Sequence, residues 1–175
     1  CSFTGAARGP GRGHARDRGA IRLDIDAGGG APTEYQGHAV GQVLDALGDR
    51  ESPLIRAAAT RGLVYPVVRE SRADPAAIAD RLVRAANDED PGVRIGALRA
   101  LSTYPEIPQG AKLVSLLDDV HSNVQVQAAQ TLGSVAGPEV TEALSRVVES
   151  EKGSWGRRHA AFLALARQDT AAFGR

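Results

Sequence analysis

The sequence predicts an all-α protein, an α-solenoid of about four stacked helix pairs preceded by a flexible N-terminal tail. Three observations support this prediction. Apolar residues recur at helical spacing from about residue 37 onward. Prolines stand where new helices would begin. Similar helical segments also recur at intervals of about 31 to 38 residues, a period typical of stacked supersecondary units.

Composition argues against several classes of protein. The 175 residues include 21 basic and 21 acidic side chains, a balance that argues against a surface devoted wholly to nucleic acid or anionic lipid. Only 4% are aromatic, which is low for base-stacking platforms and for most small-ligand pockets. The single cysteine excludes an intramolecular disulfide. No apolar run approaches the roughly 20 residues that span a bilayer as a helix.

Residues 1–36 are predicted to form a flexible tether. They hold eight of the chain's 20 glycines, and ordering so many glycines costs more backbone entropy than their few neighbouring side chains could offset. Within them, Ile21, Leu23 and Ile25 alternate with charged residues, a pattern typical of a short strand. Such a strand would need a sheet edge on a partner, and chance alternation is the alternative.

Cys1 is both the only cysteine of the chain and its first residue. This arrangement resembles a mature bacterial lipoprotein, in which a signal peptide is removed just ahead of a cysteine that becomes lipidated. The resemblance implies a lipid anchor at Cys1, which would hold the protein on the periplasmic or extracytoplasmic side of a membrane. The alternatives are a fragment or a numbering choice, and a cytoplasmic location.

Residues 37–175 are predicted to form the repeat domain, with repeats at about 37–72, 73–105, 106–136 and 137–168. Each repeat carries an apolar stripe at helical spacing. The stripes are Val40, Val43, Leu44 and Leu47; Ile78, Leu82 and Ala85; Val114 and Leu117; and Ala143, Leu144, Val147 and Val148.

Proline positions predict where the helices begin. Pro53, Pro75 and Pro91 each follow a serine or aspartate that can cap a helix, and proline at the first helical position lacks only an N–H that would have been unsatisfied anyway. Pro138 precedes a further apolar run. Pro66 falls inside an apolar segment and should end or kink the helix that begins at Pro53.

The second helices of the predicted pairs align with one another. In segments 52–63, 90–101 and 122–132, a branched aliphatic residue is followed by alanine four positions on and leucine eight positions on, so all three share one helix face. Segment 154–165 keeps the register but has Arg157 at the aliphatic position. Such small faces are expected to be buried in tight antiparallel pairs, each leaving a flank that the next pair covers.

The pattern D-x-D-P-x-V-R-x-x-A-x-x-A-L, which runs from Asp88 to Leu101, resembles the second-helix signature of HEAT or HEAT-like repeats. The resemblance covers residues 38 to 168. It implies that an aspartate before the helix and an arginine within it bridge adjacent repeats. Only Asp88 with Arg94 reproduces this inter-repeat pair cleanly, so the bridging is expected to fail at both ends of the array.

In such solenoids the second helices line the concave side, where a partner would bind. A mixed strip with arginines suits protein partners that carry carboxylates or an extended acidic segment. The predicted partner-binding residues are Arg56, Arg61, Arg94, Ile95, Leu98, Arg99, Gln125, Gln130, Arg158, His159 and Phe162. Trp155, before the last helix, is interpreted as a cap over the final repeat, with an exposed binding hot spot as the alternative.

The sequence offers no catalytic or metal-binding constellation. Its four histidines share no ligand spacing, and it lacks nucleophile motifs and phosphate-binding loops. We therefore expect no cofactor and no small-molecule substrate, but a non-enzymatic scaffold or adaptor subunit of a larger membrane complex. Three alternatives stay open: a soluble HEAT-repeat adaptor fragment, a nucleic-acid binder that uses the Arg/Gly-rich arm, and a lyase-type enzyme built on HEAT-like repeats.

Overall fold

A computed structural model describes residues 40–48, 51–64, 74–104, 109–135 and 137–173. All regular elements in these ranges are helical, so the all-α prediction is confirmed for them. After a short helical segment at residues 40–45, the helices are α2 (Pro53–Gly62), α4 (Pro75–Ala85), α5 (Pro91–Leu101), α6 (Gly110–Leu113), the 3₁₀ helix η1 (Val114–Asp118), α7 (Ser122–Leu132), α8 (Pro138–Glu149) and α9 (Trp155–Phe173).

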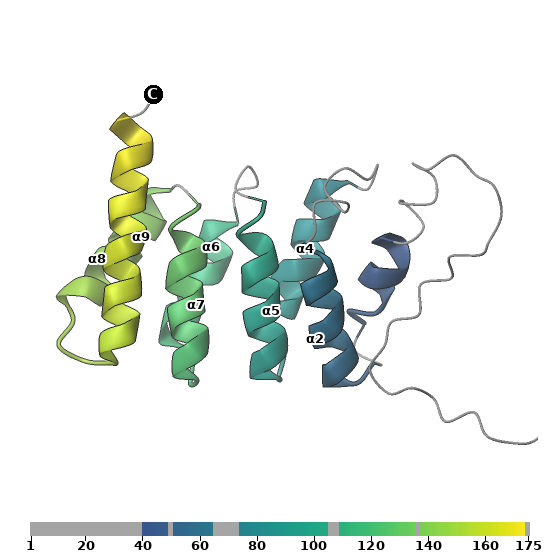
Figure 1. The fold of residues 1–175 in the computed structure, drawn as a ribbon. Coiled ribbons are helices and arrows are strands. Elements are labelled where there is room, and N and C mark those ends of the chain that lie inside the picture. The colour runs from purple at the N-terminus through teal and green to yellow at the C-terminus, as the bar shows by residue number, and fades with distance from the viewer. Residues whose placement is uncertain (1–39, 49–50, 65–73, 105–108, 136, 174–175) are drawn as a thin grey trace, which may run out of the picture.

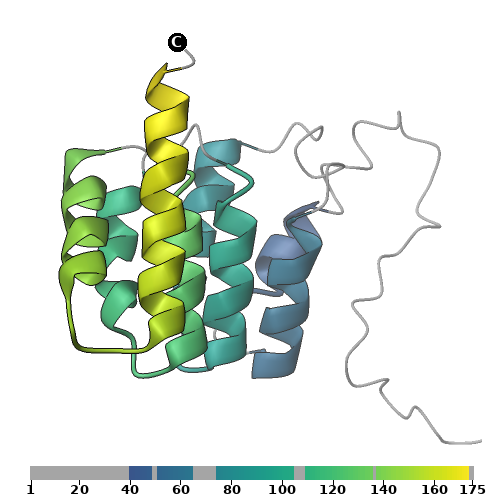
Figure 2. The same cartoon turned by 60° about the vertical axis from the view of Figure 1, so that its left-hand side comes forward.

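The helices lie in two layers. In Figure 1, α2, α5, α7 and α9 stand side by side in chain order, and each packs against the next. The second layer contains α4, which packs on α5, η1, which packs on α7, and α8, which packs on α9. Figure 2 shows the same row turned, with α9 at its end and α8 beside it. We call α2, α5, α7 and α9 the inner row.

The predicted helix starts are confirmed by their caps. The Ser52 side chain accepts a hydrogen bond from the N–H of Ile55, and that of Asp74 accepts one from the N–H of Ala76. Asp90 Oδ1 accepts two, at 2.8 and 3.1 Å, from the first turn of α5. These oxygens satisfy N–H groups that have no partner within the helix, so each cap fixes a helix start.

The third pair departs from the simple pattern. Its first helix is split into the four-residue α6 and the five-residue η1, which meet between Leu113 and Val114. The stripe of Val114 and Leu117 therefore lies on a 3₁₀ helix rather than on an α-helix. Leu117 still reaches the core, because it is buried together with Leu113.

Small residues let the inner helices approach closely. Gly96 of α5 lies against Thr60 of α2, and a Cβ atom at Gly96 would collide with the Thr60 hydroxyl. A Cβ at Gly133, the residue that ends α7, would lie 2.9 Å from the Cα of Ala164 in α9. Glycine is therefore required at these positions by the packing between neighbouring helices.

Polar groups also join successive members of the inner row. Thr131 of α7 donates its hydroxyl to the carbonyl oxygen of Leu98 in α5 at 2.9 Å. Gln168 of α9 donates to the carbonyl oxygen of Leu132 in α7 at 3.0 Å. Each bond reaches the C-terminal turn of the preceding inner helix, where it adds to a local bond: Leu98 O also accepts from the N–H of Ser102, and Leu132 O from the N–H of Val135, both at 3.1 Å.

Several predicted features lie outside the described residues. These are Cys1 and its lipid anchor, the tether, the alternating segment at residues 21–25, the Arg/Gly-rich arm and Pro66. They stay predictions. Within the described ranges, no helix is long and apolar enough to cross a membrane.

Candidate functional site

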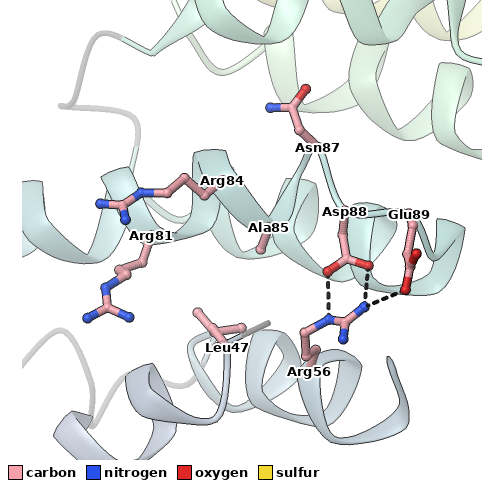
Figure 3. Close-up of a pocket in the computed structure, with 9 residues that line it drawn as sticks. Leu47, Arg56, Arg81, Arg84, Ala85, Asn87, Asp88 and Glu89 are labelled. Carbon is pink, nitrogen blue, oxygen red and sulfur yellow. Dashed lines mark hydrogen bonds and ion pairs between the residues drawn. The ribbon is translucent and has the colours of Figure 1, made fainter. Parts of the chain in front are cut away.

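Arg56 joins α2 to the loop that precedes α5 (Figure 3). Its Nε and Nη2 donate to the two carboxylate oxygens of Asp88 at 2.6 and 2.8 Å, and its Nη1 donates to the carbonyl oxygen of Glu51 at 2.6 Å. The carboxylate of Glu89 lies 3.5 Å from Nη2. The side chains of Arg56 and Asp88 are only 6% and 11% exposed. Arg56 is therefore a structural bridge.

Arg94 forms a second bridge one helix pair further along. Its Nη2 lies 2.9 Å from Asp119 Oδ1, in the loop before α7. Its Nη1 donates to the carbonyl oxygens of Asp88 and Glu89 at 2.8 and 3.0 Å. Arg94 thus holds its own preceding loop and the next loop at once, as Arg56 does. We call the two bridges, Arg56–Asp88 and Arg94–Asp119, the arginine–aspartate ladder.

The same register position continues into the last two inner helices without a carboxylate partner. Gln125 of α7 donates to the carbonyl oxygen of Asp119 at 2.6 Å. Arg158 of α9 donates to the carbonyl oxygens of Ser150 and Glu151, both at 3.2 Å. Both side chains keep the bond to their own loop. The amide of Gln125 carries no charge, and among the described residues Arg158 has no ion pair to a carboxylate.

The predicted inter-repeat pair of Asp88 with Arg94 needs a correction. Both residues bridge adjacent helix pairs, but their side chains belong to different bridges, and Arg94 reaches only the main chain of Asp88. The ladder holds at the first pair, where Arg56 binds Asp88, but among the described residues it stops after Arg94–Asp119, at the end of the row where Gln125 and Arg158 bind only backbone carbonyls. The bridged residues are 32 and 25 positions apart. The signal the sequence offered was the position of the aspartate, since Asp88 and Asp119 each lie three residues before an inner helix begins.

The ladder holds its carboxylates in the charged form. Burial raises the pKa of Asp88, but hydrogen bonds from Arg56 and from the N–H of Asp90 outweigh it, so the pKa lies below its usual value. The pKa of Asp119 is lowered in the same sense: burial raises it, while the N–H of His121 and the guanidinium of Arg94 lower it more. The hydrogen bond to Asp88 is the main reason why the pKa of Arg56 is raised.

Three of the predicted partner-binding residues are buried. Arg56 and Arg94 are enclosed by the ladder, and Leu98 is fully buried in the core. Assigning them to the binding strip is wrong, because each following helix pair covers one flank of the helix before it, and helical periodicity within one segment does not show that cover. The other predicted residues are exposed (Arg61, Arg99, Gln130, His159 and Phe162) or half-buried (Ile95, Gln125 and Arg158).

One exposed side chain recurs at the same register position of each inner helix. Arg61 of α2, Arg99 of α5, Gln130 of α7 and Leu163 of α9 are all exposed. We call these four residues the open strip. Arg99 Nε also donates to Gln127 Oε1 at 3.0 Å, which orients its side chain along the row. A hollow of about 330 Å³ between α7 and α9 borders Gln130 and Leu163.

The start of α9 is exposed. Trp155 is 70% exposed and stacks on His159, with 4.7 Å between ring centroids and 9° between ring planes. The interpretation of Trp155 as a cap over the final repeat is therefore wrong. Arg157, at the aliphatic position, is mostly buried, and its Nη2 lies 2.9 Å from Asp118 Oδ1. An arginine is accepted there because η1 ends with a carboxylate.

A larger hollow, of about 500 Å³, lies beside the first ladder bridge. It is lined by Arg56 and Asp88, which are already bonded to each other, and by Arg81 and Arg84 of α4, which point away from that pair (Figure 3). Across the described ranges, no group of three histidine, cysteine, aspartate or glutamate side chains could hold a metal ion. No protein-family model matches the chain, and no curated protein matches it.

Proposed function

We propose that the chain is an α-solenoid of about four HEAT-like repeats that acts as a non-enzymatic protein-interaction module. The packing of the inner helices in chain order supports the solenoid, as does the ladder that joins one pair to the next. In such an array each unit covers the flank of its neighbour, and the row of equivalent helices offers one continuous surface to a partner.

The open strip is the observation that carries the proposed function. Four successive inner helices expose side chains at one register position. Packed helices lie about 8–10 Å apart, so the strip is about 30 Å long. An extended peptide rises about 3.3 Å per residue, so a segment of about nine residues could lie along the whole strip.

The chemistry of the open strip defines the partner. Arg61 and Arg99 occupy one end, Gln130 the middle and Leu163 the other end. Guanidinium groups bind carboxylates in a two-bond geometry, and exposed apolar side chains favour an apolar partner surface. The partner is therefore an extended protein segment that is acidic in one half and apolar in the other.

A labelled peptide tests this proposal. The probe is a fluorescein-labelled 12-residue peptide with glutamates in one half and leucines in the other, and fluorescence anisotropy with the full chain measures its Kd. The variant Arg61→Glu/Arg99→Glu should weaken binding by at least about tenfold, since two attractive contacts become repulsive. Arg94 is not a suitable target, because replacing it would break a buried ion pair.

The matched control is Arg146→Glu, an exposed arginine on α8 in the second layer. It makes one of the same charge changes away from the open strip and should leave the peptide affinity within about twofold. If the peptide fails to bind the full chain, or binds the control and the strip variant equally, the proposed function is contradicted.

A further inference from the structure

The outward face of α9 differs from the same face of the other inner helices. Phe162 occupies the register position of Thr60 in α2, Leu98 in α5 and Ala129 in α7. Those three residues are 0% exposed, whereas Phe162 is 56% exposed. Of these, Thr60 lies against Gly96 of the next inner helix, α5. The face that carries Phe162 is therefore of the kind that the fold otherwise covers.

The guanidinium of Arg158 on this face also lacks an opposite charge among the described residues. Arg56 and Arg94 each bind a carboxylate in the loop before the next inner helix. Arg158, at the same position in α9, keeps the bonds to its own loop carbonyls, which hold its guanidinium in the ladder position. Within the described part of the chain, it has no carboxylate partner. The face thus offers a positioned cation for a carboxylate.

The apolar part of the face is large for a face that no described helix covers. Trp155 and Phe162 are 70% and 56% exposed, and His159, stacked on Trp155, lies between them. An outer face of a repeat array on which nothing stacks is usually polar. Clustered aromatic residues beside an arginine are instead typical of the centre of a protein interface.

We propose that this face of α9, formed by Trp155, Arg158, His159 and Phe162, binds a helical hairpin of another protein, which stacks on it as one more repeat would. The site is separate from the open strip, and the inference goes beyond the proposed function. The ladder defines the chemistry of the hairpin. Asp88 and Asp119 each stand three residues before an inner helix begins, so the hairpin carries aspartate or glutamate at that position.

The hairpin helix that faces α9 must also carry small side chains opposite Phe162. Thr60 is met by Gly96, and no larger side chain would fit opposite it. Phe162 projects further than Thr60, so the helix that covers it needs glycine or alanine opposite the ring. A second copy of this chain offers the wrong charge, because its sequence has Arg50 three residues before Pro53, where Asp88 stands before Pro91. The hairpin is therefore not the first helix pair of a second copy.

Trp155 is the only tryptophan of the chain and lies within the face, so its fluorescence reports what covers it. The experiment uses the full chain and a displayed library of disulfide-stapled, tryptophan-free two-helix hairpins, with one alanine-rich helix face and a randomised loop before that helix. Selection should enrich aspartate or glutamate three residues before the helix. The selected hairpins should protect Trp155 from acrylamide quenching, which should be unhindered in the free chain.

Two substitutions and two controls decide whether the face is responsible. Arg158→Gln and Phe162→Ala should each weaken hairpin binding at least about tenfold. Arg146→Gln, and Leu54→Ala at a side chain that is also 56% exposed, should change it less than about twofold. In the Phe162→Ala background, changing Arg61 and Arg99 to glutamate should still weaken binding of the acidic peptide. Failure of this inference is therefore distinguishable from failure of the proposed function.

Five results would overturn the inference. Hairpins selected without an acidic loop residue, no selected hairpin at all, or binding that tolerates both substitutions would remove the proposed recognition. Protection of Trp155 in the free chain at every concentration would show that another segment of the same chain covers the face. Protection that grows with the concentration of the chain alone would show that a second copy covers it.

Discussion

The guanidinium of Arg56 and the carboxylate of Asp88 face each other edge to edge, joined by two parallel hydrogen bonds of 2.6 and 2.8 Å. The two residues belong to successive helix pairs, 32 positions apart in the chain, and both side chains are nearly buried. Such a two-bond pair has a strict geometry, so it fixes how one pair sits on the next. Removing one partner would leave the other as a buried charge without an ion-pair partner.

The first prediction concerns the stability of this bridge. Asp88→Asn should lower the free energy of unfolding by about 3 kcal/mol, because Arg56 stays charged in a buried site. Urea unfolding at neutral pH, followed by circular dichroism, measures the change. Asp80→Asn is the control: its carboxylate pairs with Lys112 at 3.4 Å, both half exposed, and such pairs contribute about 0–1 kcal/mol. Similar losses in the two variants would argue against the structural role of the bridge.

The second prediction concerns acid. The pKa values of Asp88 and Asp119 are lower in the folded chain than the usual value of about 4. The unfolded chain therefore binds protons first as the pH falls, and the contribution of the ladder is fully present above pH 4. It should be lost as the pH drops from about 4 through the lowered folded-state values.

Measuring unfolding free energy from pH 6 to pH 2 checks this prediction. The chain should lose stability more steeply below about pH 4 than the double variant Asp88→Asn/Asp119→Asn, which lacks both linked protons. Asp80→Asn should keep the steep slope of the unmodified chain. Parallel curves for the unmodified chain and the double variant would mean that other carboxylates govern acid unfolding.

The third prediction concerns the close approach of α2 and α5. Gly96→Ala places a Cβ against Thr60, so it should destabilise the chain by about 1–3 kcal/mol. Alanine otherwise favours helices over glycine by about 1 kcal/mol, so a loss would identify the collision as its cause. Gly41→Ala is the matched control in helical segment 40–45, because a Cβ there meets nothing within 4 Å.

Thermal unfolding of the two glycine variants gives opposite expected shifts. Gly96→Ala should lower the Tm, and Gly41→Ala should leave it unchanged or raise it. Adding Thr60→Ala to Gly96→Ala should cost less than the two single losses together, since it removes the colliding hydroxyl. An unchanged Tm for Gly96→Ala would show that the two helices lie further apart than the structure has them.

Local features of the fold could be predicted from the sequence. A capping oxygen and a following proline act within one helical turn, so the starts at Pro53, Pro75 and Pro91 were predicted correctly. Alanine-lined faces predicted tight packing, and Ala59 and Ala97 are fully buried. These features need only the chain near each residue.

Features that depend on the next helix pair could not be read in the same way. Leu98 looks like an outward residue within α5 alone, and only α7 and the rest of the core make it buried. Asp88 lies near Arg94 in sequence, but the arginine that reaches its carboxylate comes from the preceding pair. The exposure of Trp155 likewise depends on what stacks beyond α9. These outcomes follow from packing between units, which helical periodicity does not encode.

The central claim is that the inner helices are stacked in chain order. Pairs of spin labels test it most directly, on chains in which Cys1→Ser leaves only the introduced cysteines, at Arg61→Cys with Gln130→Cys and at Arg61→Cys with Leu163→Cys. Pulsed electron paramagnetic resonance should give a separation from position 61 that is about 10 Å longer to position 163 than to position 130, one helix spacing further. A shorter separation to position 163 than to position 130 would show a closed bundle and contradict the stacked array.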